Sequence, residues 1–129
     1  MEQLWAPWRM EYLQGAGKDT GCFLCDLADA TGESPIVVWR GRRVYALLNA
    51  FPYANGHVMV VPYVHEGQLD RLDEPTALEL MTGLRLVVRA LRAEYGPEGF
   101  NVGANLGGAA GAGHGDHLHV HVVPRWSRD

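Results

Sequence analysis

The sequence lacks long apolar runs, and its beginning lacks the pattern of a secretion signal. No stretch reaches the roughly 18 consecutive apolar residues that a membrane-spanning helix needs. Met1 to Trp5 shows neither the basic nor the apolar region of a signal peptide. We therefore expect a cytoplasmic protein that has no membrane partner.

Positive charge is also scarce, because 11 Lys and Arg residues face 15 Asp and Glu residues, for a formal net charge of -4. A protein that binds nucleic-acid polymers normally carries a basic face or tail. We therefore expect no nucleic-acid polymer as a partner. A small phosphorylated molecule is still compatible with this charge, since a few local donors can hold it.

The chain contains no internal repeat, and apart from one glycine-rich stretch it contains no linker or low-complexity tract. Its 129 residues are 47% hydrophobic, which is enough to bury the core of one domain. The sequence therefore predicts a single domain over residues 1–129.

Five apolar segments have the length and pattern of β-strands. They cover residues 36–39, 44–49, 57–62, 100–105 and 117–124. Pro52 and the Asn55-Gly56 pair favour a reversing turn between the second and third segments. These two strands should therefore pair antiparallel.

One long amphipathic helix is predicted from Pro75 to Tyr95, with Asp73 as its N-cap and Gly96-Pro97 as its end. The apolar residues that repeat at three- and four-residue steps, and that we expect on its buried face, are Leu78, Met81, Leu84, Val88, Leu91 and Tyr95. The resulting fold class is α+β, with a five-stranded, mainly antiparallel sheet, one long helix and one short helix.

The last predicted strand carries three histidines, His117, His119 and His121, at alternate positions. Alternate side chains share one face of a strand, so Leu118, Val120 and Val122 should pack on the core while the imidazoles line a surface or cleft. A solvated polar face would rarely collect three histidines. Nucleophilic catalysis is the favoured interpretation, and a catalytic metal site is the alternative.

The two cysteines, Cys22 and Cys25, are separated by two residues. In a reducing compartment this spacing indicates either half of a metal site or a redox motif. A redox motif is normally preceded by a strand, and no strand pattern precedes this pair. Half of a zinc site is therefore the favoured interpretation.

The motifs together resemble the histidine triad (HIT) superfamily. The resemblance rests on the three alternating histidines followed by Pro124-Arg125, and on Leu48-Asn49 followed by the block from Gly56-His57 to Pro62. The Trp-rich opening Leu4 to Tyr12 and the Ala-Gly loop are most similar to bacterial members described as diadenosine polyphosphate phosphorylases or hydrolases.

The resemblance implies a homodimeric enzyme that acts on the α-phosphate of nucleoside 5'-phosphate derivatives through a covalent nucleotidyl-histidine. His119 would be the nucleophile, His121 would bind the phosphate oxygens and His57 would support them. Asn49 matches a position that contacts the ribose, although capping of the following turn explains it nearly as well. The expected substrate is an adenine nucleotide such as a dinucleoside polyphosphate or a phosphoramidate.

A glycine-rich loop from Asn105 to Gly113 precedes the histidine strand. Its glycines allow backbone amides to turn toward an anion, although a simple connection of small residues would have the same composition. Because the loop lies close to His119, Asn105, Gly111 and Gly113 are predicted to bind substrate. Related enzymes often carry Gln, Ser or Thr where this chain has Gly113 and His114. His114 is either a general acid that also contacts substrate or an exposed loop residue.

The resemblance also implies a structural zinc ion held by Cys22, Cys25, His65 and His117, and no organic cofactor. These four residues supply the ligand types of a closed tetrahedral site. Two alternative functions stay open, namely a nucleotide-binding or sensing protein with little turnover and a metal-dependent hydrolase.

Overall fold

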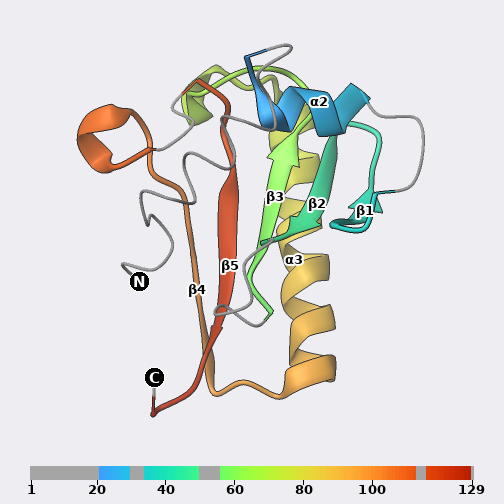
Figure 1. The fold of residues 1–129 in the computed structure, drawn as a ribbon, viewed down its shortest axis with the longest axis vertical. Coiled ribbons are helices and arrows are strands. Elements are labelled where there is room, and N and C mark those ends of the chain that lie inside the picture. Colours follow the sequence, from blue (N-terminus) through green and yellow to red (C-terminus); the bar gives the residue numbers. More distant parts are fainter. Residues whose placement is uncertain (1–20, 30–33, 50–55, 113–115, 129) are drawn as a thin grey trace.

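The computed structural model describes residues 21–29, 34–49, 56–112 and 116–128. Within them, five strands form one sheet in the order β1-β2-β3-β5-β4, and every neighbouring pair is antiparallel. The strands are β1 (Val37–Arg40), β2 (Val44–Leu48), β3 (Val58–Pro62), β4 (Gly99–Gly103) and β5 (Val120–Arg125). The predicted antiparallel sheet is therefore confirmed (Figure 1).

The histidine strand begins later than predicted, at Val120 instead of His117. Two hydrogen bonds outside the sheet explain the difference. The His117 ring nitrogen Nε2 donates to the Pro62 carbonyl oxygen at 2.9 Å, and the Leu118 amide donates to the Glu66 carbonyl oxygen at 2.7 Å. Pro62 itself has no amide proton with which to extend a ladder.

The long helix is confirmed as α3 (Glu74–Tyr95), which begins one residue earlier than predicted and has the predicted N-cap Asp73 and the predicted end at Gly96. The Asp73 carboxylate accepts a hydrogen bond from the Thr76 amide at 3.0 Å, which satisfies one of the amides at the start of the helix. Hydrogen bonds from the Thr76 hydroxyl and amide hold the pKa of Asp73 below its usual value. Gly96 ends the helix in the left-handed conformation, with φ 56° and ψ 47°.

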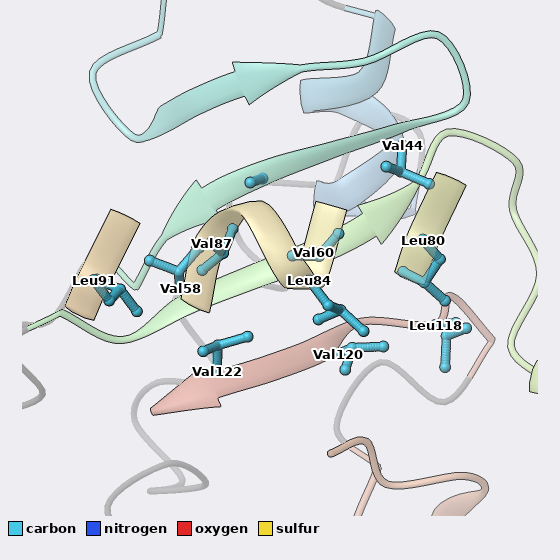
Figure 2. Close-up of a cluster of buried hydrophobic side chains, with 11 residues drawn as sticks. Val44, Val58, Val60, Leu80, Leu84, Val87, Leu91, Leu118, Val120 and Val122 are labelled. Carbon is cyan, nitrogen blue, oxygen red and sulfur yellow. The ribbon is translucent and has the colours of Figure 1, made fainter. Parts of the chain in front are cut away.

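The buried face of α3 differs from the predicted one. Leu84 and Leu91 are buried as expected, but Leu78 is 69% exposed and Met81 is 58% exposed, and Tyr95 is exposed as well. Leu80 and Val87 take their places in the core (Figure 2). Both sets repeat at helical spacing, so the pattern alone did not identify the set that faces the sheet.

Gly83 lies on the true buried face and lets the helix approach the sheet closely. A Cβ atom at this position would lie 3.2 Å from both the Trp39 and the Val60 side chains. The core between α3 and the sheet is built from β2, β3, β5 and the helix, and Figure 2 shows their apolar side chains gathered in one cluster.

The opposite face of β2 and β3 packs against the short helix α2 (Phe23–Asp29) (Figure 1). Tyr45 and Leu47 point toward this helix, and the Tyr45 hydroxyl donates to the Leu24 carbonyl oxygen at 2.6 Å. β2 and β3 are therefore covered on both faces, which explains their nearly continuous apolar sequences. The homodimer stays a prediction.

Among the described helices, none combines the length and the apolar character needed to cross a lipid bilayer. The residues of the predicted turn after β2, from 50 to 55, lie outside the described part of the chain.

Candidate functional site

The three histidines lie on the side of their segment that faces away from α3. Leu118, Val120 and Val122 belong to the helix-facing core, so alternation directs the imidazoles to the other face. The imidazoles are nevertheless buried, since His117 is 0% exposed and His119 and His121 are each 7% exposed. Of the two predicted settings, a surface or a cleft, their burial excludes an exposed surface, and the imidazoles form a largely desolvated cluster.

Asn49, His57 and His121 form a hydrogen-bonded chain. The Asn49 side-chain nitrogen lies 2.7 Å from His57 Nδ1, and His57 Nε2 lies 2.8 Å from His121 Nδ1. Because an amide nitrogen can only donate, His57 Nδ1 accepts and its Nε2 carries the proton that His57 donates to His121. His121 consequently carries its own proton on Nε2.

His119 is oriented by the backbone of its own segment. Its Nδ1 atom lies 2.9 Å from the carbonyl oxygen of His117, which can only accept. A neutral His119 therefore carries its proton on Nδ1 and an electron lone pair on Nε2. The His119 and His121 rings meet edge-on, with centroids 5.2 Å apart and planes at 75°.

A second cluster brings together Cys22, Cys25, His65 and His117, whose ligand atoms all lie within 4.8 Å of one another. Cys22 Sγ lies 3.2 Å from His117 Nδ1, and Cys25 Sγ lies 3.1 Å from His65 Nδ1. These spacings suit one ion with sulfur ligands at about 2.3 Å and nitrogen ligands at about 2.0 Å. The cluster could hold a metal ion.

The far nitrogen of each histidine in this cluster also has a partner. His117 Nε2 donates to the Pro62 carbonyl oxygen, and His65 Nε2 lies 3.1 Å from an Asp116 carboxylate oxygen. Such partners fix the ring so that the other nitrogen faces the ion. Sequence reasoning missed Asp116, although a carboxylate directly before a ligand histidine is a signal that could have found it.

Burial, together with the neighbouring Cys22, raises the pKa of the Cys25 thiol to about 12. The thiol therefore retains its proton at neutral pH unless a cation replaces it. A metal ion that binds both sulfur atoms must displace protons, as thiolate coordination generally does.

The glycine-rich loop contains the short 3-10 helix η3 (Gly108–Ala110), and glycines with positive φ lie at both of its ends. Asn105 Nδ2 donates to the Gly111 carbonyl oxygen at 3.5 Å, which brings two predicted substrate-binding residues together. Gly113 and His114, like the Trp-rich opening, lie outside the described residues.

Comparison with known proteins shows which family has these features. The family model described as HIT domain matches residues 32–128, which is most of the chain. The chain belongs to the HIT domain family. Among curated relatives of this HIT protein, the AP-4-A phosphorylase of Mycobacterium tuberculosis is 41% identical over 137 residues, which cover 100% of this chain and 70% of that protein.

Solved HIT structures share the fold. A HIT family protein from Bacillus subtilis superposes with a TM-score of 0.73 at 27% identity, covering 83% of this chain and 74% of that one. A Zn-bound histidine triad family protein from Mycobacterium smegmatis superposes with a TM-score of 0.70 at 26% identity, covering 85% and 78% of the two chains. The predicted fold and family are therefore confirmed.

Proposed function

We propose that this HIT-family enzyme transfers a nucleotidyl group from a nucleoside 5'-phosphate derivative through a covalent intermediate on His119. The observation that carries the proposal is the hydrogen bond from His119 Nδ1 to the His117 carbonyl oxygen at 2.9 Å. It leaves Nε2 with the lone pair that a nucleophile needs.

In the first step, His119 Nε2 attacks the α-phosphorus, an N–P bond forms and the bond from phosphorus to the leaving-group oxygen breaks. The leaving group departs with the electron pair of that bond. Positive charge develops on the imidazole of His119, and the carbonyl oxygen at Nδ1 stabilises this charge. Burial of the ring strengthens the interaction, because water screens it weakly.

His121 would act on the phosphoryl oxygens. The hydrogen-bonded chain from Asn49 through His57 fixes the proton of His121 on Nε2. This N–H group can donate to a nonbridging phosphate oxygen as negative charge develops there. In this scheme Asn49 orients His57, and its predicted contact with the ribose stays a prediction. His57 does not contact the reacting phosphate in this scheme and acts on it through its hydrogen bond to His121.

In the second step, an oxygen of water or of inorganic phosphate attacks the same phosphorus, the N–P bond breaks and His119 regains its lone pair. The acceptor loses one proton to solvent or to the leaving group. Asn105, Gly111, Gly113 and His114 are proposed to bind the remaining part of the substrate. The name of the mycobacterial relative, AP-4-A phosphorylase, supports diadenosine tetraphosphate as substrate and phosphate as acceptor.

Trapping the intermediate tests this proposal. The full-length protein is incubated with diadenosine tetraphosphate, quenched and digested, and the peptide that contains His119 is examined by mass spectrometry. We expect an adenylyl adduct on His119 that is absent from His119→Ala, together with loss of turnover in that variant. Full activity of His119→Ala would overturn the proposal.

Calorimetric titration with AMP, combined with a turnover assay, distinguishes a nucleotide-binding protein that has little turnover. Such a protein would bind AMP in a calorimeter but release no product from any substrate tested, with or without phosphate. Its basis in the sequence is the departure from the usual Gln, Ser or Thr at Gly113 and His114, and because both residues lie outside the described part of the chain, no described contact favours it.

We also propose that Cys22, Cys25, His65 and His117 hold a structural zinc ion. Four protein ligands complete a tetrahedral set and leave no position for a water nucleophile. When bound, the ion would cross-link segments that are far apart in the sequence, since Cys25 lies on α2 and His117 lies just before β5. His119 is not one of the four ligands, which favours covalent catalysis over metal-dependent hydrolysis.

Elemental analysis tests the zinc proposal. We expect about one zinc per chain in the purified protein, as in other single structural sites, and its loss in Cys22→Ser. Ser127→Ala, at an exposed position away from the four ligands, serves as the control. A protein that is purified without metal and has the same melting temperature with and without added zinc would contradict the proposal.

A further inference from the structure

A cleft of about 400 Å³ lies beside the start of α3, and none of its lining residues belongs to the histidine cluster or to the four metal-ligand residues. Small-molecule sites commonly have volumes of about 300 to 1,000 Å³. Three arginines line the cleft: Arg42 and Arg43 from the turn between β1 and β2, and Arg71 from the 3-10 helix η2 (Leu69–Arg71).

Two carboxylates also line the cleft, and both are already engaged within the protein. Asp73 accepts a hydrogen bond from the Thr76 amide and lies 4.0 Å from Arg43. Glu66 accepts a hydrogen bond from the Gln68 amide at 3.0 Å. Arg43 therefore offsets the charge of Asp73, whereas Glu66 keeps its charge, and the lining of three arginines and two carboxylates has an excess of one positive charge.

Arg42 and Arg71 are the cations left over. Within the described ranges, no carboxylate oxygen lies within 4.0 Å of the guanidinium nitrogens of either arginine. The two arginines come from separate segments, so the fold brings two guanidinium groups without a described ion-pair partner to one concave surface.

We propose that this cleft binds a small anion with two or more phosphate groups. Guanidinium groups match phosphate oxygens in geometry and can bind them with paired hydrogen bonds. Two guanidiniums on separate segments favour a ligand with more than one charged group over a single chloride or carboxylate. The ligand class therefore includes inorganic pyrophosphate and the oligophosphate chain of a nucleotide.

The wall of the cleft is also connected to the histidine cluster. Part of the cleft is lined by Tyr63, Val64 and Glu66. The segment that contains them also forms hydrogen bonds with the residues just before β5. The Pro62 carbonyl oxygen accepts from the His117 ring, and the Glu66 carbonyl oxygen accepts from the Leu118 amide. An anion bound in the cleft thus contacts the segment that supports the histidines without contacting them.

Amide NMR of the full chain, titrated with inorganic pyrophosphate at low salt, tests this site. We expect shifts of the amide signals of Arg43, Val64 and Thr76. Arg42→Gln combined with Arg71→Gln should raise the dissociation constant at least tenfold, because each lost charge-assisted contact weakens binding. Arg89→Gln, which removes an exposed charge from α3 outside the cleft, should leave the constant unchanged.

Pyrophosphate could also bind at the histidines, so the titration is repeated in His119→Ala, where the cleft signals should still shift. The amide spectrum of each variant checks its fold, and the two single arginine variants replace the double variant if it misfolds. Shifts confined to signals around His119 and His121, or equal affinities of the arginine variants and Arg89→Gln, would overturn the proposal.

Discussion

His57 Nε2 lies 2.8 Å from His121 Nδ1, and Asn49 determines which of the two atoms donates. The asparagine amide can only donate to His57, so the proton of His57 must face His121. These hydrogen bonds join residues that are not adjacent in the sequence, so the sequence neighbours of each histidine alone could not fix the position of its proton. His121 is the candidate hydrogen-bond donor to the phosphate, and the position of its proton is therefore set by Asn49, which precedes β3.

Asn49→Asp should disturb catalysis more than Asn49→Ala. At about pH 9, where histidines are ordinarily neutral, a carboxylate at position 49 can only accept, so His57 would turn its proton away from His121. His121 Nε2 would then lose its proton and could no longer donate. We expect kcat to fall roughly a hundredfold or more, as when one transition-state donor is removed.

Alanine at position 49 leaves the tautomers of His57 and His121 free to equilibrate, so its loss of kcat should be smaller. Nitrogen-15 NMR of the two imidazoles at the same pH reports the tautomers directly. Equal kcat values for the two variants, or unchanged tautomers in Asn49→Asp, would show that the hydrogen-bond chain does not control His121.

Asp116→Asn should weaken zinc binding roughly tenfold to a hundredfold, the usual effect of removing a partner of a ligand histidine. The reason is the 3.1 Å contact between Asp116 and His65 Nε2, which orients the ring and raises the basicity of the ligand nitrogen. Competition with a chromogenic chelator measures the affinity. Asp70→Asn, an exposed acid on η2, is the matched control, and equal affinities of the two variants would contradict this role.

Asp73→Ala should lower the melting temperature at neutral pH, because the Thr76 amide loses its acceptor. The folded state lowers the pKa of Asp73, so its ionised carboxylate stabilises the protein above the unfolded pKa of about 3.9. This stabilisation is lost as the pH falls through the folded value. The difference between wild type and variant should therefore be constant near neutrality and shrink below about pH 4.

Asp73→Asn keeps a neutral capping group, and asparagine caps helices about as well as aspartate. Its melting temperature relative to Asp73→Ala should therefore not depend on pH in the acidic range. Calorimetric melting curves of the three proteins from pH 3 to pH 7 check both expectations. A difference between wild type and Asp73→Ala that grows toward low pH would show the opposite linkage.

Local signals predicted the parts of the fold that depend on neighbouring residues. Asp73, Gly96 and Pro97 identified the ends of α3, and the alternation of Leu118 to Val122 identified the core face of β5. These features depend on hydrogen bonds and side-chain directions that involve only residues close together in the sequence, so a short stretch of sequence is enough to predict them.

The site was predictable only where a motif encodes it. Cys22 and Cys25 are recognisable by spacing, but 40 residues separate Cys25 from His65, and only the fold brings them together. The resemblance to HIT proteins supplied His65 as a predicted ligand, and the position of Asp116 directly before His117 was a signal in the sequence, but the contacts of Asp116 with His65 and of Asn49 with His57 required coordinates. Such contacts leave no periodic pattern in a sequence.

The face of α3 gives the sharpest comparison between pattern and packing. Leu78 and Leu84 both belong to the predicted apolar face, but only Leu84, which is 9% exposed, packs in the core. Leu84→Ala should lower the free energy of unfolding by about 2 to 5 kcal/mol through lost burial and a cavity. Leu78→Ala, at 69% exposure, should change it by no more than about 0.5 kcal/mol. Urea denaturation of both variants measures the difference, and similar losses would mean that Leu78 is covered in solution, for example by a second copy of the chain.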